Sequence, residues 1–159
     1  MEESPDGYLR PPSPEIRVMV ADDHELIRSA VRQALRPADD IRVVAETADG
    51  ESTLAALSTH TVDVLLLDMH MPKGDGLFVL DQLRELGHEV AVLILSVEEN
   101  REVAVEALRR GATGYILKSI RPVDLASAVR QAANGNVYMG GPGLVGSLPP
   151  RPSSQVRSD

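Results

Sequence analysis

Solid blocks of apolar residues recur along this chain, and stretches in which apolar residues return every three or four positions separate them. The clearest block is Val64–Leu67, four large apolar residues in a row with no alternation of apolar and polar positions. If such a block forms a strand, both of its faces must be covered, as in a parallel sheet between two layers of helices. On this basis we predict strands over residues 16–21, 41–45, 64–67, 90–95 and 115–117.

The stretches of helical spacing follow the predicted strands and end at residues that stop helices. The first stretch stops before Pro37, the third at Gly87, the fourth near Gly111 and the last before Asn134. Five strands alternating with five helices predict an α/β fold. Its form is a doubly wound, five-stranded parallel sheet with right-handed crossovers.

The two ends of the chain lack this pattern. Residues 1–14 contain four prolines, and Gly, Pro and Ser dominate from Gly140 onward. Such composition is typical of linkers and disordered segments. We therefore predict a disordered leader over residues 1–14, one domain over residues 15–137, and a linker or disordered tail over residues 138–159.

Composition narrows the classes of protein to which the chain can belong. The 159 residues contain no cysteine, which excludes disulfides and thiolate metal sites. The formal net charge of -8 argues against a broad basic face that binds nucleic acid. There is no recognisable signal peptide, and no apolar run approaches the roughly 18 residues that span a bilayer. We expect a cytoplasmic protein without a membrane partner.

Polar and charged residues stand where four of the predicted strands end. Asp22 and Asp23 follow the first strand, Asp68 the third, Ser96 the fourth and Lys118 the fifth. The carboxyl ends of parallel strands meet at one edge of the sheet, where open α/β folds bind ligands, so we expect these side chains to converge. Like charges about 4 Å apart repel by roughly 4 kcal/mol near a protein surface. Lys118 and a hard divalent ion, Mg²⁺, could together offset the carboxylates, whereas a structural salt bridge would explain one pair only.

These residues resemble the receiver domain of two-component response regulators, over about residues 16–135. The motifs that carry the resemblance are Asp22-Asp23, Asp68, Met71-Pro72, Gly76, Ser96, Tyr115 and Lys118. Two further segments are similar to the subfamily whose receivers are joined to a LuxR-type helix-turn-helix domain: Ala21-Asp22-Asp23-His24 and Gly114-Tyr115-Ile116-Leu117-Lys118-Ser119. The resemblance implies a flavodoxin-like fold and a signalling domain, not an enzyme, although such a domain can catalyse its own phosphorylation and dephosphorylation.

The resemblance also implies roles for individual residues. Asp68 would take a phosphoryl group from a sensor histidine kinase, and Lys118 would hold a phosphoryl oxygen. Asp23, Asp68 and the backbone carbonyl of His70 would bind Mg²⁺ directly, while Asp22 would act through a coordinated water. These roles agree with the chemistry, because phosphoryl transfer needs positioning and charge neutralisation more than acid-base catalysis.

A conformational switch is implied at Ser96 and Tyr115. Ser96 would hydrogen-bond the new phosphoryl group and draw its loop inward, and Tyr115 would swing from an exposed to a buried position. Ser96 stands where Thr is commoner in the family, and the following Val97 could slow access to the site. The rings of His24 and His70 are interpreted as solvent-exposed loop side chains, not as metal ligands.

The expected output is control of transcription through a DNA-binding domain that is missing from this chain, and a receiver that stands alone is the other possibility. We also expect phosphorylation to promote a homodimer, and the sequence leaves two surfaces open for it. One is the fourth helix with the fifth strand; the other is the first and last helices, which often form an isologous dimer face in receivers that resemble this subfamily. The residues that suggest this surface are Val123, Ala126, Val129, Arg130 and Ala133.

A phosphatase or phosphotransferase that uses Asp68 as a nucleophile on small substrates is the competing hypothesis. Such enzymes usually place an acid-base residue two positions beyond the nucleophile, where this chain has His70. They also need a cap over the site, and the sequence shows no cap segment. A receiver that keeps its phosphoryl group and an enzyme that turns it over would differ in mass after exposure to acetyl phosphate.

Overall fold

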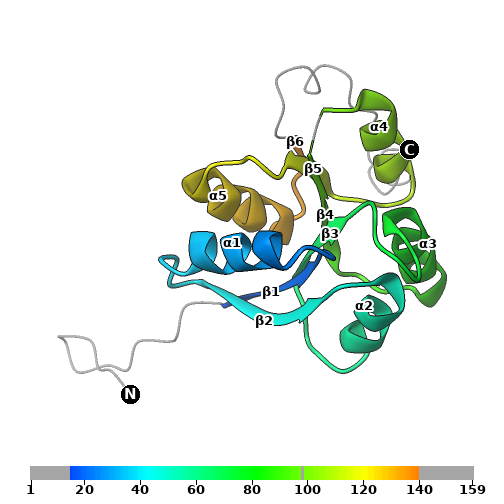
Figure 1. Cartoon of the computed structure of the whole chain (residues 1–159), viewed down its shortest axis with the longest axis horizontal. Helices are drawn as coiled ribbons and strands as arrows, with labels where there is room; N and C mark the ends of the chain where they lie inside the picture. Colours follow the sequence, from blue (N-terminus) through cyan, green and yellow to red (C-terminus); the bar gives the residue numbers. More distant parts are fainter. Residues whose placement is uncertain (1–14, 98, 140–159) are drawn as a thin grey trace.

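The computed structural model of the chain describes residues 15–97 and 99–139, which form one sheet between two layers of helices (Figure 1). The strands are β1 (Ile16–Ala21), β2 (Ile41–Thr47), β3 (Val64–Asp68), β4 (Ala91–Ser96), β5 (Gly114–Leu117) and β6 (Tyr138–Met139). The helices are α1 (Glu25–Leu35), α2 (Gly50–Leu57), α3 (Gly76–Leu86), α4 (Arg101–Arg109) and α5 (Pro122–Ala133). Every strand pair is parallel, and the order across the sheet is β2-β1-β3-β4-β5-β6.

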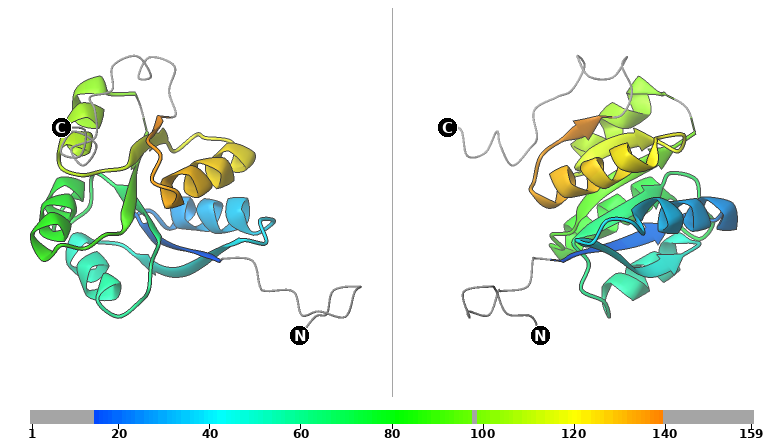
Figure 2. Two further views of the ribbon diagram at one scale, coloured as in Figure 1. Left: turned by 180° about the vertical axis from the view of Figure 1, so that it is seen from behind. Right: turned by 90° about the vertical axis from the view of Figure 1, so that its left-hand side faces the viewer.

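Helices α1 and α5 cover one face of the sheet, and α2, α3 and α4 cover the other (Figure 2). Each face has its own apolar core. Leu65 and Leu67 of β3 pack with the layer of α2, α3 and α4, while Val64 and Leu66 pack with the layer of α1 and α5. All four side chains are fully buried, which explains why this block of the sequence shows no alternation.

The predicted fold class is confirmed, because five strands alternating with five helices build the doubly wound sheet. The short sixth strand was not predicted. Its two residues, Tyr138 and Met139, pair with Gly114 and Tyr115 of β5. The sheet therefore extends into the stretch that was expected to be linker or tail. The predicted leader and residues 140–159 of the predicted tail lie outside the described residues.

Capping residues define the starts of α2 and α3 and the end of α3. Asp49 accepts a hydrogen bond from the Ser52 N–H at the start of α2, and Asp75 accepts one from the Phe78 N–H at the start of α3. Helix α3 ends at Gly87, whose φ of 68° lies in the left-handed region that suits glycine. Across the described ranges, each helix is too short or too polar to cross a bilayer.

Candidate functional site

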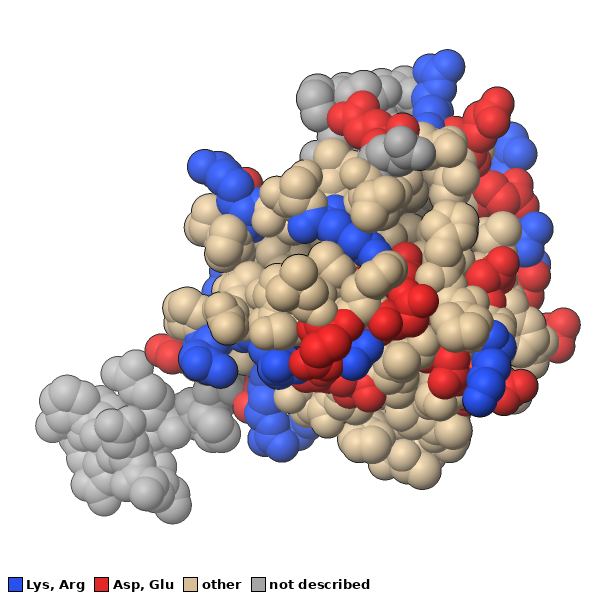
Figure 3. All heavy atoms as spheres, in the orientation of Figure 1, with Lys and Arg blue, Asp and Glu red and all other residues tan. Residues whose placement is uncertain are grey.

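The carboxyl ends of β1, β3, β4 and β5 meet at one edge of the sheet. Backbone pairing of Asp68 with Leu95 and of Ser96 with Leu117 keeps the neighbouring strand ends level. Acidic side chains gather near the centre of the face seen in Figure 3, next to a streak of basic atoms. The chain passes from β1 outward to β2 and then back to β3, so this edge is the switch point at which doubly wound sheets bind ligands.

Lys118 forms ion pairs with two buried aspartates at this edge. Its Nζ lies 2.8 Å from Asp22 Oδ2 and 3.3 Å from Asp68 Oδ1. The exposed fractions of the three side chains are 7% for Lys118, 0% for Asp22 and 5% for Asp68, so solvent screens these charges weakly. One ammonium group is therefore paired with two buried carboxylates. A structural salt bridge would account for only one of these two acids.

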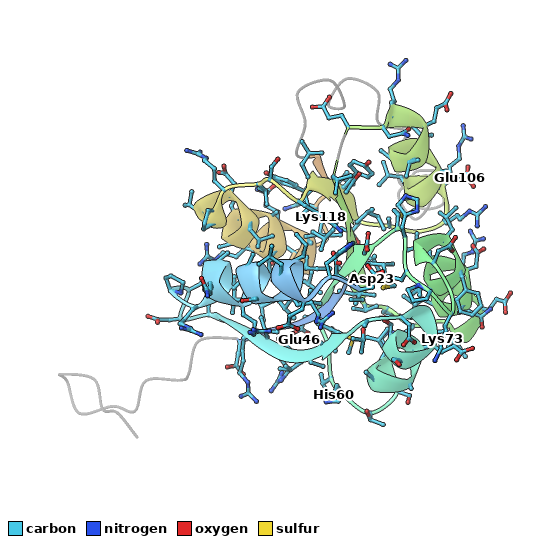
Figure 4. The ribbon with its side chains drawn as sticks, in the orientation of Figure 1. Asp23, Glu46, His60, Lys73, Glu106 and Lys118 are labelled. Carbon is cyan, nitrogen blue, oxygen red and sulfur yellow. The ribbon has the colours of Figure 1, made fainter. Side chains whose placement is uncertain are left out.

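Asp23, labelled in Figure 4, adds a third carboxylate to Asp22 and Asp68. Ligand atoms of Asp22, Asp23, His24 and Asp68 all lie within 4.8 Å of one another. Among the described residues, the buried Asp68 Oδ2 has no hydrogen-bond partner, and Asp22 Oδ2 has none beyond its ion pair with Lys118. A buried polar atom left in that state costs roughly 1–3 kcal/mol. A hard cation with oxygen ligands fits this set of donors.

The two histidines near the acids occupy different positions. His24 is the residue before α1, and its Nδ1 lies 3.1 Å from Oδ1 of both Asp22 and Asp23. Its side chain is 66% exposed, as expected, but its contact with both acids was not predicted. A signal existed, because a residue two positions after an aspartate can close a turn on it. The His24 N–H does so by donating to Asp22 Oδ1 over 2.9 Å.

His70 contributes its backbone to the site. Its N–H donates to Asp68 Oδ1 over 3.3 Å, and its exposed side chain is not one of those in the acidic group. The interpretation of the His70 ring as an exposed loop side chain therefore agrees with the structure. The carbonyl of the same residue belongs to the loop that runs from β3 to α3.

The environment of Asp68 opposes its ionisation. Burial of the carboxyl group, followed by the negative charge of Asp22, raises the pKa of Asp68 above its ordinary value. The hydrogen bond from the His70 N–H and the nearby Lys118 act in the opposite direction but do not cancel this rise. Additional positive charge at the site would favour the ionised form that a nucleophile requires.

A pocket of about 210 Å³ opens beside Asp68, and Ser96, Val97 and Tyr115 are among the residues that line it. Val97 is 76% exposed. Tyr115 is 0% exposed and belongs to the core beneath α4, so the exposed starting position expected for this side chain is not what the structure shows. Strand β5 lies between β4 and β6, and its Tyr115 side chain points into the apolar layer on that face.

The loop between β3 and α3 is held by the first residues of α2. The N–H of Gly50 donates to the carbonyl of Pro72 over 3.2 Å. A Cβ on Gly50 would overlap the carbonyl of Gly74, so this close approach requires glycine. Because the same loop carries the backbone of His70, the start of α2 helps to position the backbone of the site.

The family of response regulator receiver domains matches residues 18–130 of the chain. This match covers most of the described sheet and all of the strand ends discussed above. The chain therefore belongs to the response regulator receiver domain family, as the motifs in its sequence indicated.

Two curated relatives show which branch of the family the chain resembles. It is 39% identical over 122 residues to the nitrate/nitrite response regulator protein NarL of Escherichia coli (strain K12), a match that covers 77% of this chain and 56% of NarL. It is 35% identical over 125 residues to the oxygen regulatory protein NreC of Staphylococcus carnosus (strain TM300), covering 78% of this chain and 58% of NreC. The chain thus spans a little more than half the length of these relatives.

A solved structure has the same architecture. The signal receiver domain of NarL from Mycobacterium tuberculosis is 35% identical to this chain and superimposes with a TM-score of 0.75, covering 78% of this chain and 100% of that one. The similarity to NarL receivers in both sequence and structure agrees with the subfamily that the sequence indicated. It also favours a receiver over the phosphatase alternative.

Proposed function

We propose that Asp68 accepts a phosphoryl group from a sensor histidine kinase and that the domain thereby controls transcription through a DNA-binding domain of the full-length protein. The observation that carries this proposal is the Asp68 carboxylate itself. It is buried at the carboxyl edge of the sheet, 3.3 Å from Lys118 Nζ, with one oxygen that has no hydrogen-bond partner among the described residues. Membership of the receiver family supports the assignment.

The proposed reaction is an in-line transfer to the carboxylate. An oxygen of Asp68 attacks the phosphorus of a phosphohistidine, an O–P bond forms, and the N–P bond breaks with its electron pair returning to the imidazole nitrogen. The product is an acyl phosphate whose added negative charge lies beside Asp22 and Asp23. The Lys118 ammonium offsets this charge by holding a phosphoryl oxygen.

The acidic group is the proposed Mg²⁺ site. Direct ligands would be the carboxylates of Asp23 and Asp68 and the carbonyl of His70, while the buried Asp22, already paired with Lys118, would act through a coordinated water. When bound, the ion supplies positive charge that neutralises the transferred oxygens. The contact of His24 with the same acids does not make it a ligand in this proposal, because a hard ion prefers oxygen.

The raised pKa of Asp68 makes this positive charge important for reactivity, since only the ionised carboxylate is a nucleophile. With Lys118 and Mg²⁺ in place, the same site can take a phosphoryl group from a small donor such as acetyl phosphate. It can also release the group by hydrolysis. Autophosphorylation and autodephosphorylation are therefore part of the proposal, without making the domain an enzyme for other substrates.

Ser96 and Tyr115 are the proposed switch residues, and both line the pocket beside Asp68. The Ser96 hydroxyl would hydrogen-bond a phosphoryl oxygen and draw the loop after β4 inward. Tyr115 is already buried, so we propose that it stays in place and that the loop after β4 packs against it. The moving element is then the loop, with little change at Tyr115.

The proposed assembly is a phosphorylation-dependent homodimer through α1 and α5. A largely apolar pocket of about 120 Å³ lies between these helices. Each helix also carries an exposed apolar side chain, Leu26 on α1 at 79% and Val123 on α5 at 67%. The surface differs from the one expected from the sequence. Val129 is 0% exposed and Ala126 is 7% exposed, because this side of α5 packs on the sheet. Arg130 and Ala133 of that set are exposed as well, but Val123 is its one exposed large apolar residue and therefore the residue that tests the interface.

Intact-mass measurement after incubation with acetyl phosphate and Mg²⁺ tests the proposed function. Wild-type protein should gain the mass of one phosphoryl group, and Asp68→Asn should gain none. Continuous consumption of acetyl phosphate without a lasting adduct would instead support the phosphatase alternative. No adduct and no consumption by the wild-type protein would contradict the proposal.

A further inference from the structure

Two arginines of α1 share the same pair of acidic partners. Arg28 Nη2 donates to Glu25 Oε1 over 2.6 Å, and its Nε lies 3.4 Å from Glu46 Oε1. Arg32 Nη1 lies 2.7 Å from both carboxylate oxygens of Glu46, and its Nη2 lies 3.7 Å from Glu25 Oε2. Glu46 belongs to β2, where Figure 4 shows it next to α1. Both arginines therefore tie α1 to the neighbouring strand.

Arg28 makes one contact that distinguishes it from Arg32. Its Nη1 donates to the backbone carbonyl of Asp22 over 2.6 Å. The Arg28 side chain is also less exposed than that of Arg32, at 17% against 38%. Short hydrogen bonds from a charged donor are among the strong ones, and the planar guanidinium can make three such contacts at once.

The carbonyl that Arg28 holds belongs to the peptide unit between Asp22 and Asp23. Because a peptide unit is planar, fixing this carbonyl also fixes the direction in which the chain enters Asp23. Asp22 is held on its other side as well, since its N–H donates to the Thr47 carbonyl over 3.0 Å. The Asp23 carboxylate is 33% exposed and contacts the exposed ring of His24. Its position therefore depends on the backbone that carries it.

We infer that Arg28 is a positioning residue for the Mg²⁺ site. It orients the peptide between Asp22 and Asp23 so that the Asp23 carboxylate stays beside Asp68. This inference rests on the proposed function, which assigns Mg²⁺ to these acids. The inference also predicts the direction in which replacing Arg28 changes the Mg²⁺ affinity. The hydrogen bond orders a ligand, so its loss should weaken binding. If the positive charge of Arg28 acted alone, it would repel the ion, and its loss would strengthen binding.

Titration of folded protein with Mg²⁺, by calorimetry and by NMR of the Asp23 amide, tests this inference. Arg28→Gln should weaken Mg²⁺ binding by roughly tenfold, the effect typical of losing a residue that orients a metal ligand. Arg28→Lys should also bind more weakly than wild type, because an ammonium keeps the charge but not the planar fork. The matched control is Arg32→Gln, which removes the same charge from the same acidic partners and should leave the affinity within about twofold of wild type.

The possible results distinguish a failure of the proposed role of Arg28 from a failure of the proposed Mg²⁺ site. Binding by Arg28→Gln as tight as wild type, or tighter, would overturn the positioning role while leaving the Mg²⁺ site intact. If Arg28→Gln does not fold, Arg28→Lys provides the test instead. A wild-type affinity for Mg²⁺ in that variant would overturn the role of the planar guanidinium of Arg28. A wild-type protein that binds no Mg²⁺ would overturn the metal site and this inference with it. Circular dichroism of each variant before titration separates loss of affinity from loss of fold.

Discussion

The Asp68 carboxylate is a single group on which several opposing effects meet. Burial and the negative charge of Asp22 raise its pKa, and the His70 N–H and Lys118 lower it by less. The folded domain therefore holds an acid whose charge is unfavourable until more positive charge arrives. In the proposed function, the unfavourable charge of Asp68 lowers the stability of the fold and keeps a reactive carboxylate at the site, a combination common at functional sites.

Asp68→Asn is expected to raise the free energy of unfolding at neutral pH by on the order of 1 kcal/mol, the usual size of a single-residue effect. The folded pKa of Asp68 lies above the ordinary value of 3.8, so the folded state binds this proton more tightly than the unfolded state. Wild-type protein gains stability from this group as the pH falls through the folded pKa, and the gain is complete below the unfolded value. The advantage of the variant, measured by urea denaturation without Mg²⁺, should therefore shrink as the pH falls.

Asp40→Asn is the control, because folding shifts the pKa of Asp40 in the direction opposite to that of Asp68. The hydrogen bond from Arg130 lowers the pKa of Asp40, so the stability that this acid contributes is lost as the pH falls. The advantage of wild type over Asp40→Asn should decrease toward acid pH, and it should be small because the pair is largely exposed. A pH-independent difference between wild type and Asp68→Asn would show that the charge of Asp68 is not unfavourable.

Lys118→Gln is expected to destabilise the domain by about 3 kcal/mol in the absence of Mg²⁺, because it leaves two buried carboxylates without their cation. Adding Asp68→Asn to this variant should restore part of the loss, since one of the two acids is then neutral. Lys73→Gln is the matched control, because Lys73 is the only other lysine of the chain and is exposed. Equal stability of the Lys118 and Lys73 variants would contradict the electrostatic account of the site.

At the scale of elements, the sequence predicted every strand and helix that carries a long apolar pattern. Residues 64–67 lack alternation because they are buried on both faces, and this signal identified the centre of the sheet. The convergence of the acids, Ser96 and Lys118 followed from the parallel arrangement alone. Strand β6 escaped prediction because two residues are too few to show a period.

Other features could not be predicted because they depend on how elements turn and pack. Val129 and Val123 both belong to α5, but only the rotation of the helix on the sheet decides that Val129 is buried and Val123 exposed. The contact of His24 with two acids depends on the turn before α1. The hydrogen bond from Arg28 to the Asp22 carbonyl depends on the same turn, and no residue pattern marks it.

Gly50→Ala is expected to destabilise the domain by about 1–3 kcal/mol, although alanine is the better helix former. The added Cβ overlaps the Gly74 carbonyl and must push the loop after β3 away from α2. The same displacement should weaken Mg²⁺ binding, which is measured by titration of the folded variant. Gly87→Ala is the control: a Cβ there meets nothing within 4 Å, and any cost comes from its φ of 68°. A weakening of Mg²⁺ binding as large in this control would contradict the role of the Gly50 contact.

At the scale of the whole molecule, the proposed dimer uses only one of the two layers of helices. The acidic edge lies at the ends of the central strands, and α1 and α5 form the layer beside Lys118 with an apolar pocket between them. A second copy could cover this layer without blocking the opposite one. The proposed dimer would then place two output domains in a symmetric arrangement.

Sedimentation with and without beryllofluoride should show that the phosphoryl mimic increases self-association of the wild-type domain. Val123→Glu should abolish the increase, because a carboxylate would be placed on the apolar surface of α5. Leu86→Glu is the matched control, since Leu86 is 70% exposed and lies on α3 in the other layer. A monomer under all conditions, or equal effects of the two substitutions, would contradict the proposed interface.

Locating the phosphoryl group on the chain tests the central claim most directly. Wild-type protein labelled with acetyl phosphate and Mg²⁺ is treated with borohydride, which reduces an acyl phosphate to an alcohol, and the modified residue is then identified by peptide mass spectrometry. We predict that Asp68 is converted to homoserine and that Asp22 and Asp23 remain aspartate. Reduction at Asp22 or Asp23, or a phosphoryl group on the ring of His70 with Asp68 unmodified, would contradict the account.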